Sequence, residues 1–249
     1  MITQTRILLA ATTAMMLMAC QKNDMPVKTT SDAGTNTSPS QDSAEARGHS
    51  MVRVVNAVSG GKTVDVQVEG STVFAGVAAD GVTDYKELDA KSAQFTVRQA
   101  GMADGTPITE NSEILMDGNR YTAFVVAEDV SKSVLRIVRD DVVPDSGKAR
   151  IRVVHAAPGG PEVDVTIAGT KDPIFSGVNF KSEAGYSDVE PGVVTLEVRA
   201  NKEAKVLLRV RDVDLRRGTA TTVVITGAQK LAAFKFTDAL MAAATSPKP

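Results

Sequence analysis

The chain carries nearly the same stretch of sequence twice, and this duplication limits what it can fold into. "RVVNAVSGGKTVDV" begins at Arg53, and "RVVHAAPGGPEVDV" begins at Arg152, 99 positions later. Val52–Gly70 and Ile151–Gly169 are identical at 10 of 19 aligned positions. A match of this length indicates that one structural unit occurs twice in the chain.

The two copies extend well beyond this stretch. "FAGV" in the first copy matches "FSGV" in the second, Tyr85 matches Tyr186, and "GNRYTAFVVA" aligns with "GTATTVVITG". Each copy therefore covers about 90 residues, which is more than the roughly 20–50 residues of a solenoid unit. We predict two tandem domains, a first β-sandwich repeat over residues 51–143 and a second over residues 148–240.

Each copy has the pattern of short β-strands. "VDVQV" and "VDVTI" alternate apolar and polar residues, as a strand with one buried face does. "FTVRQ", "TLEVRA" and "LLRVRDVDL" are rich in residues that favour strands, and Gly and Pro mark turns between them. About seven short strands in such a length are typical of a two-sheet sandwich. The predicted fold class is all-β, with two tandem immunoglobulin-like antiparallel β-sandwich domains after a signal peptide and a disordered tether.

The second copy resembles a known family. "RVVHAAPGGPEVDVTIAGT", followed by "FSGV" and a later Tyr, is similar to the opening of the domain-of-unknown-function 4397 (DUF 4397) family. That resemblance implies a β-sandwich, often in tandem, in secreted and cell-surface bacterial proteins. It brings no activity and no catalytic residue. The second copy is the closer one because it keeps His155, Pro158 and Pro161, where the first has Asn56, Ser59 and Lys62.

The N-terminus has the features of a lipoprotein signal peptide over residues 1–19. Arg6 precedes an apolar run from Ile7 to Ala19, whose thirteen residues are too few to cross a bilayer core of roughly 30 Å as a helix. Cys20 follows "LMA", which resembles the lipobox of bacterial lipoproteins and implies lipid attachment, including palmitate, at Cys20. Gln21 after this cysteine, by the Gram-negative sorting rule, favours the outer membrane.

Residues 20–50 lack any periodic pattern of apolar residues. Ser, Thr, Asp, Asn, Gly and Pro dominate this segment, so it cannot bury enough surface to offset the entropy lost on ordering. We expect a lipidated cysteine and a flexible tether here, and a C-terminal tail over residues 241–249. The expected location is the bacterial cell envelope, lipid-anchored at the outer membrane, facing the periplasm or the cell surface.

His155 is the first candidate site residue. It ends a strand and shares a face with Ile151 and Val153, so it could be a metal ligand or a general base. The first copy has Asn56 at this position, another side chain with a donor and an acceptor. We therefore expect His155 to hydrogen-bond a loop rather than to titrate. The second histidine, His49, is expected in the tether and apart from His155.

The repeated acids and tyrosines have structural interpretations as well. Asp65 and Asp164 are expected to be solvated or to pair with Arg across the strands, because no calcium-binding pattern surrounds them. Tyr85 and Tyr186 are expected to anchor a sandwich corner through their hydroxyl groups. "RDDVVPD" is expected to link the domains, and "RDVDLRR" to lie in a strand with an exposed edge.

The residue content excludes several function classes. The 28 basic and 30 acidic residues give a net charge of −2, which offers no attraction to nucleic acid. No G-x-S-x-G, H-E-x-x-H, P-loop or dinucleotide motif occurs. We expect no enzyme activity, no catalytic, cofactor-binding or metal-binding residue, and no cofactor. The predicted function is a binding or structural module for an envelope protein or polysaccharide. The alternatives are a carbohydrate-active hydrolase with a distant carboxylate pair and a periplasmic sensor or assembly factor.

Overall fold

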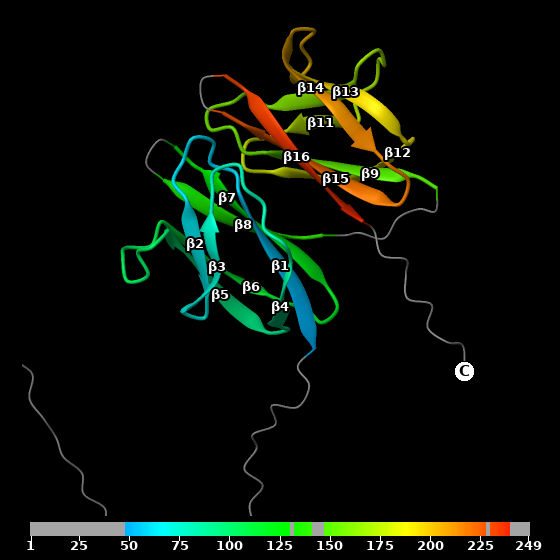
Figure 1. The fold of residues 1–249 in the computed structure, drawn as a ribbon. Helices are drawn as coiled ribbons and strands as arrows, with labels where there is room; N and C mark the ends of the chain where they lie inside the picture. The colour runs from blue at the N-terminus through cyan, green and yellow to red at the C-terminus, as the bar shows by residue number, and fades with distance from the viewer. Residues whose placement is uncertain (1–47, 130–131, 141–146, 228–229, 240–249) are drawn as a thin grey trace, which may run out of the picture. The chain divides into compact units, whose positions relative to one another are not determined.

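The structure, a computed structural model, describes residues 48–129, 132–140, 147–227 and 230–239. Within these residues it contains sixteen β-strands and no helix (Figure 1). The predicted signal peptide, Cys20, most of the predicted tether and the predicted tail lie outside the described residues. His49, expected in the tether, is instead the first residue of a strand.

The first repeat consists of eight strands in two four-stranded sheets. One sheet has the order β4-β1-β7-β8, and the other has the order β3-β2-β5-β6. The strands are β1 His49–Asn56, β2 Val64–Val68, β3 Ser71–Val77, β4 Lys86–Asp89, β5 Ser92–Gln99, β6 Thr109–Ile114, β7 Arg120–Ala127 and β8 Ser133–Arg139.

The second repeat reproduces this topology, with each strand in the place of the one numbered eight lower. Its sheets have the orders β12-β9-β15-β16 and β11-β10-β13-β14. The strands are β9 Ala149–His155, β10 Val163–Ile167, β11 Phe175–Val178, β12 Glu183–Val189, β13 Gly192–Ala200, β14 Val206–Leu215, β15 Thr219–Thr226 and β16 Ala232–Ala239.

The predicted tandem sandwich is confirmed, and each repeat adds one parallel strand pair to it. β1 pairs in parallel with β7, and β9 pairs in parallel with β15. The other pairs among the sixteen strands are antiparallel. Parallel strands need both faces covered. In agreement with this rule, every residue from Val52 to Asn56 of β1 is buried.

Alternate residues of the central strands face two different clusters. Val52 and Val54 of β1 belong to the core between the two sheets of the first repeat, and Ile151 and Val153 of β9 belong to the equivalent core of the second. Because side chains alternate along a strand, the residues between them point to the outer faces of these sheets. There they form a third buried cluster, which contains Val55, Ala57, Phe124 and Val126 of the first repeat and Val154, Ala156 and Val224 of the second.

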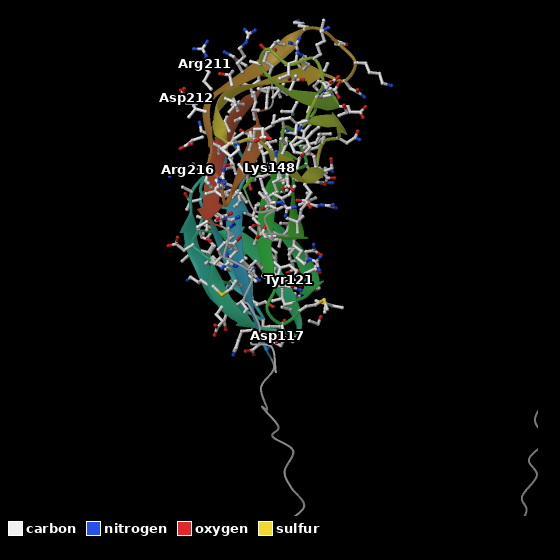
Figure 2. All side chains as sticks on the ribbon, turned by 90° about the vertical axis from the view of Figure 1, so that its right-hand side faces the viewer. Asp117, Tyr121, Lys148, Arg211, Asp212 and Arg216 are labelled. Carbon is white, nitrogen blue, oxygen red and sulfur yellow. The ribbon has the colours of Figure 1, made fainter. Side chains whose placement is uncertain are left out.

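The first five residues of "RDVDLRR" lie on β14, which is at the end of its sheet as predicted, and its last two residues follow the strand. A register shift against β13 places Asp212 in the left-handed region, with φ at 54°. Such a bulge twists a strand locally and disturbs its edge for pairing with another chain. Figure 2 shows Arg211 and Asp212 at the surface of the second repeat, and both side chains are exposed.

Candidate functional site

A hollow opens at one end of the first repeat, beside the Gly60-Gly61 turn between β1 and β2. Its volume is about 460 Å³, within the range of about 300–1,000 Å³ that is common for ligand sites. Apolar side chains form much of its wall, together with a few polar groups. The lining includes Asn56, Val58, Lys62, Val64, Gln99, Met102, Ile108, Val125, Asp129 and Lys132.

Two sequence differences explain why the first repeat is open here. The connection from β5 to β6 covers residues 100–108, whereas the equivalent connection from β13 to β14 covers only residues 201–205. Asn56 also stands where the second repeat has the larger His155 ring. The longer loop and the smaller side chain leave space inside the end of the first sandwich.

The polar groups around this hollow, hereafter the first-repeat hollow, include two cations and one acid. Lys62 Nζ donates to Gln99 Oε1 at 2.7 Å. The carboxylate of Asp129 accepts the backbone N–H of Lys132 at 2.9 Å. Both lysine side chains are exposed. The lining therefore combines an apolar wall with a slight excess of positive charge at its edge.

A second hollow of about 600 Å³ lies on the other side of the same turn. Val58, Gly61, Ala127 and Asp129 line both hollows, so the two adjoin. Small residues from both repeats form much of its wall, together with the acids Glu128 and Asp129. The small residues include Ala57, Gly60, Ala127, Ala156, Pro158, Gly159 and Gly227.

His155 is fully buried at the end of β9 and has a structural role. Its Nε2 lies 2.9 Å from Pro161 O, and its Nδ1 accepts the N–H of Ala157 at 3.3 Å. Both ring nitrogens are therefore occupied, which leaves none for a metal or a substrate. Asn56 makes comparable bonds in the first repeat, from Nδ2 to the carbonyl groups of Lys62 and Val77. The expectation of a hydrogen-bonding position is confirmed.

Burial lowers the pKa of His155 below its ordinary value of 6.5, against the opposing effect of the hydrogen bond to Pro161. The unfolded chain then binds a proton at this ring more readily than the folded chain does. This histidine therefore makes the free energy of unfolding fall as pH decreases below about 6.5. We expect His155→Asn to remove this part of the pH dependence. Urea unfolding of both proteins at several pH values between about 5 and 8 measures it, and identical pH slopes would contradict the assignment.

Asp65 and Asp164 correct an expectation, because neither is a plain surface charge or an Arg partner. The carboxylate of Asp65 accepts the N–H groups of Gly76 and Gly101 at 2.7 and 3.0 Å. Asp164 accepts those of Gly177 and Lys202 at 2.9 and 3.0 Å. All four donor residues have positive φ. Each carboxylate thus connects a bulge on one side of its strand to a turn on the other side.

We expect Asp164→Asn to lower the free energy of unfolding by about 1–3 kcal/mol, because two hydrogen bonds to a charged acceptor are weakened. Asp65→Asn is expected to have a similar effect in the first repeat. Denaturant titration measures both, with Asp172→Asn, an exposed loop residue, as the control. A change in Asp164→Asn no larger than the control's would contradict this role.

Two buried arginines form a network that the sequence patterns did not reveal. Arg53 donates to Thr122 Oγ1 at 2.9 Å and to both carboxylate oxygens of Asp238 at 2.7 Å. Arg152 donates to Thr222 Oγ1 at 2.9 Å and lies 2.6 Å from Asp140 Oδ1. Each arginine belongs to one repeat and its acid to the other. The contacts are therefore reciprocal across the third cluster.

The repeated tyrosines lie beside these arginines rather than at a corner. The Tyr85 hydroxyl donates to Asp140 Oδ2 at 2.7 Å, and the Arg53 guanidinium lies 4.5 Å from its ring centroid. Arg152 lies 4.8 Å from the ring centroid of Tyr186. Burial raises the pKa of Tyr186 to about 12, against the opposing Arg152 charge. Both tyrosines thus remain neutral and pack against a cation.

One carboxylate has a raised pKa, as a general acid would. Burial raises the pKa of Glu183, against the effect of Arg152, whose Nη1 lies 3.5 Å from its Oε2. The neighbouring carboxylate, Asp140, is buried and paired with the same arginine. The two acids therefore converge on Arg152 and not on an open cleft. The hollow beside Glu183 has a volume of only about 160 Å³.

The described part of the chain contains no group of three or more His, Cys, Asp or Glu placed to hold a metal ion. None of the described residues forms a helix long and apolar enough to cross a membrane. His49 is exposed and lies 3.5 Å from Glu87, far along the chain from His155.

The chain belongs to the DUF4397 family. The model of this family, described as a domain of unknown function, matches residues 50–166 and 156–247. The resemblance seen in the sequence is therefore confirmed, and it covers both repeats. A comparison with curated protein sequences finds no match.

Solved structures similar to the chain include two bacterial β proteins. One is a family 26 carbohydrate-binding module of Eubacterium rectale Amy13K in complex with maltoheptaose. It is 13% identical in sequence, the match covers 75% of this chain and 96% of that chain, and the TM-score is 0.26. The other is a candidate cell adhesion protein from Bacteroides uniformis ATCC 8492. It is 12% identical in sequence, the match covers 77% of this chain and 99% of that chain, and the TM-score is 0.29. Because TM-scores this low do not establish a shared arrangement, family membership defines the class of this protein.

Proposed function

We propose that this protein is a lipid-anchored, non-catalytic binding module of the bacterial cell envelope, and that its ligand enters the first-repeat hollow. The observation that carries this proposal is the contrast between the two repeats. They share sequence and topology, but beside the 460 Å³ hollow the first repeat has the smaller Asn56 and a longer β5–β6 loop, where the second has the buried His155 and a shorter loop.

A polypeptide fits this hollow better than a polysaccharide does. Proteins that bind sugar rings often use an exposed aromatic face as the platform. All ten Phe and Tyr residues of the chain are buried or half-buried, and none lines either hollow. The apolar wall suits a side chain such as Leu or Val. The proposed partner is therefore a segment of an envelope protein.

The anchor and the location are part of the same proposal. The apolar run before Cys20 and the polar segment after it support a lipidated N-terminus and a tether. Gln21 supports the outer membrane as its destination. On this proposal the repeats face the periplasm or the cell surface.

Affinity capture tests this function. The soluble chain from Gln21 to Pro249 is presented to solubilised envelope proteins and, separately, to isolated wall polysaccharides. We expect one defined protein to be retained and the polysaccharides to pass. Asn56→His, which places the second repeat's larger ring beside the hollow, is expected to lose that protein. His155→Asn is the matched control and is expected to retain it. Equal retention by both variants would contradict the site.

The hydrolase alternative has Glu183 as its best candidate, since this is the described carboxylate with a raised pKa. Glu183→Gln in the same soluble chain, assayed on the isolated wall polysaccharides, tests it. A sensor or assembly factor would also bind a protein, so the identity of the captured protein separates it from a structural module.

A further inference from the structure

We infer that the first-repeat hollow recognises an extended polypeptide segment in which an apolar side chain stands next to a carboxylate. This inference rests on the proposed function and names the chemistry of its ligand. Three features of the described residues carry it, namely the apolar wall, the charge at its edge and the second hollow beside it.

The wall determines what fills the hollow. Val58, Val64, Ile108 and Val125 line it, and Val64 and Val125 also belong to the buried core. An apolar side chain that enters the hollow extends this core. Its transfer out of water contributes about 25 cal/mol of binding free energy per Å² of apolar surface buried. Met102 is 54% exposed and also lines the hollow, and its unbranched side chain can adjust to an occupant.

The charged residues of the lining determine which ligand group is favoured next to the apolar side chain. Lys62 and Lys132 are the cations of the lining, and Asp129 is its one acid among the described residues. The ammonium group of Lys62 meets the neutral Gln99, and the carboxylate of Asp129 accepts a backbone N–H of its own turn. A carboxylate on the ligand complements this edge, whereas a second cation is repelled by it.

The second hollow favours an extended chain over a small molecule. It adjoins the first-repeat hollow across the Val58–Gly61 turn, and much of its wall consists of small residues such as Ala156 and Gly159. Asp129 and Glu128, which pairs with Lys181, also line it. A backbone can closely approach the part of the wall that these small residues form. An extended segment can therefore place one side chain in the first hollow and continue along the second.

A hexapeptide positional-scanning library tests this inference on the soluble chain from Gln21 to Pro249. We expect selection of Leu, Ile, Val or Met at one position, with Asp or Glu selected at a neighbouring position. In the double variant Lys62→Glu, Lys132→Glu the neighbouring position is expected to select Lys or Arg. Both changes are at exposed side chains and leave the fold intact. Lys171→Glu, at an exposed loop position of the second repeat, is the control and is expected to keep the acidic preference.

The selected peptide then provides an affinity measurement. We expect Asn56→His to weaken its binding about tenfold or more, and the double lysine variant to weaken it by a few-fold for each ion pair lost. Two results would overturn the inferred recognition of a carboxylate and leave the proposed function standing. One is selection of an apolar residue without a neighbouring acid, and the other is an acidic preference that persists in the double lysine variant. Binding that survives Asn56→His, or no selection at all, would overturn both.

Discussion

Replacing Arg152 with Met is expected to lower the free energy of unfolding by about 3–5 kcal/mol. Arg152 is 1% exposed and its partner Asp140 is buried in the other repeat. Without the guanidinium, the carboxylate of Asp140 stays in the interior without its directly paired cation. Urea unfolding with linear extrapolation measures the change.

Two further variants distinguish the loss of the buried ion pair from the effect of removing any arginine. Arg216 is paired with Asp214 at the surface, and its side chain is 70% exposed. Arg216→Met is therefore expected to change stability by no more than about 0.5 kcal/mol. Adding Asp140→Leu to Arg152→Met is expected to recover part of the loss, because the unpaired acid is removed. A double variant less stable than Arg152→Met would contradict the buried pair.

Phe124→Ala is expected to cost about 3–5 kcal/mol and to weaken the second repeat as well as the first. Phe124 lies on β7 of the first repeat, but its ring is in the third cluster with Val154 and Val224 of the second. Its removal therefore leaves a cavity at the face that both repeats bury. Part of the loss should appear as faster amide hydrogen exchange in β15 under native conditions.

Phe95→Ala is the matched control for this experiment. Phe95 is equally buried, but it lies in the core between the two sheets of the first repeat. A comparable loss of stability is expected, with the exchange of β15 unchanged, because local opening of the second repeat does not involve this core. If Phe124→Ala and Phe95→Ala affected β15 alike, the third cluster would not couple the repeats.

The duplicated stretch and its alternating strands were enough to predict two tandem β-sandwiches. The alternation in "VDVQV" and "VDVTI" correctly placed their valines in the two cores, although Gln67 and Thr166 on the other face are buried as well. The exchange of His155 for Asn56 correctly indicated a hydrogen-bonding position, because the two side chains share donor and acceptor capacity. Local pattern and pairwise comparison of the copies are sufficient for features of this kind.

The third cluster escaped prediction because it depends on how the copies meet. Each copy places an arginine between two buried aliphatic residues, and on a single sandwich that arginine would face water. Only a partner sheet turns this outer face into an interior, and no local pattern specifies one. The sequence signal for burial on both faces was the apolar run around each arginine, "VRVV" and "IRVV", but it does not identify the covering sheet. The Asp65 and Asp164 bonds were missed for a related reason, since their donors come from distant turns.

The reciprocal pairs of Arg53 with Asp238 and Arg152 with Asp140 also bear on how this gene can evolve. Loss of either copy by recombination would expose the apolar third cluster of the remaining copy to water, and replacement by a copy lacking its half of the pairs would leave a buried charge unpaired. Both changes are expected to lower stability, so a requirement for folding favours keeping both copies. While both copies are retained, the loops at one end of the first copy could change and form the first-repeat hollow.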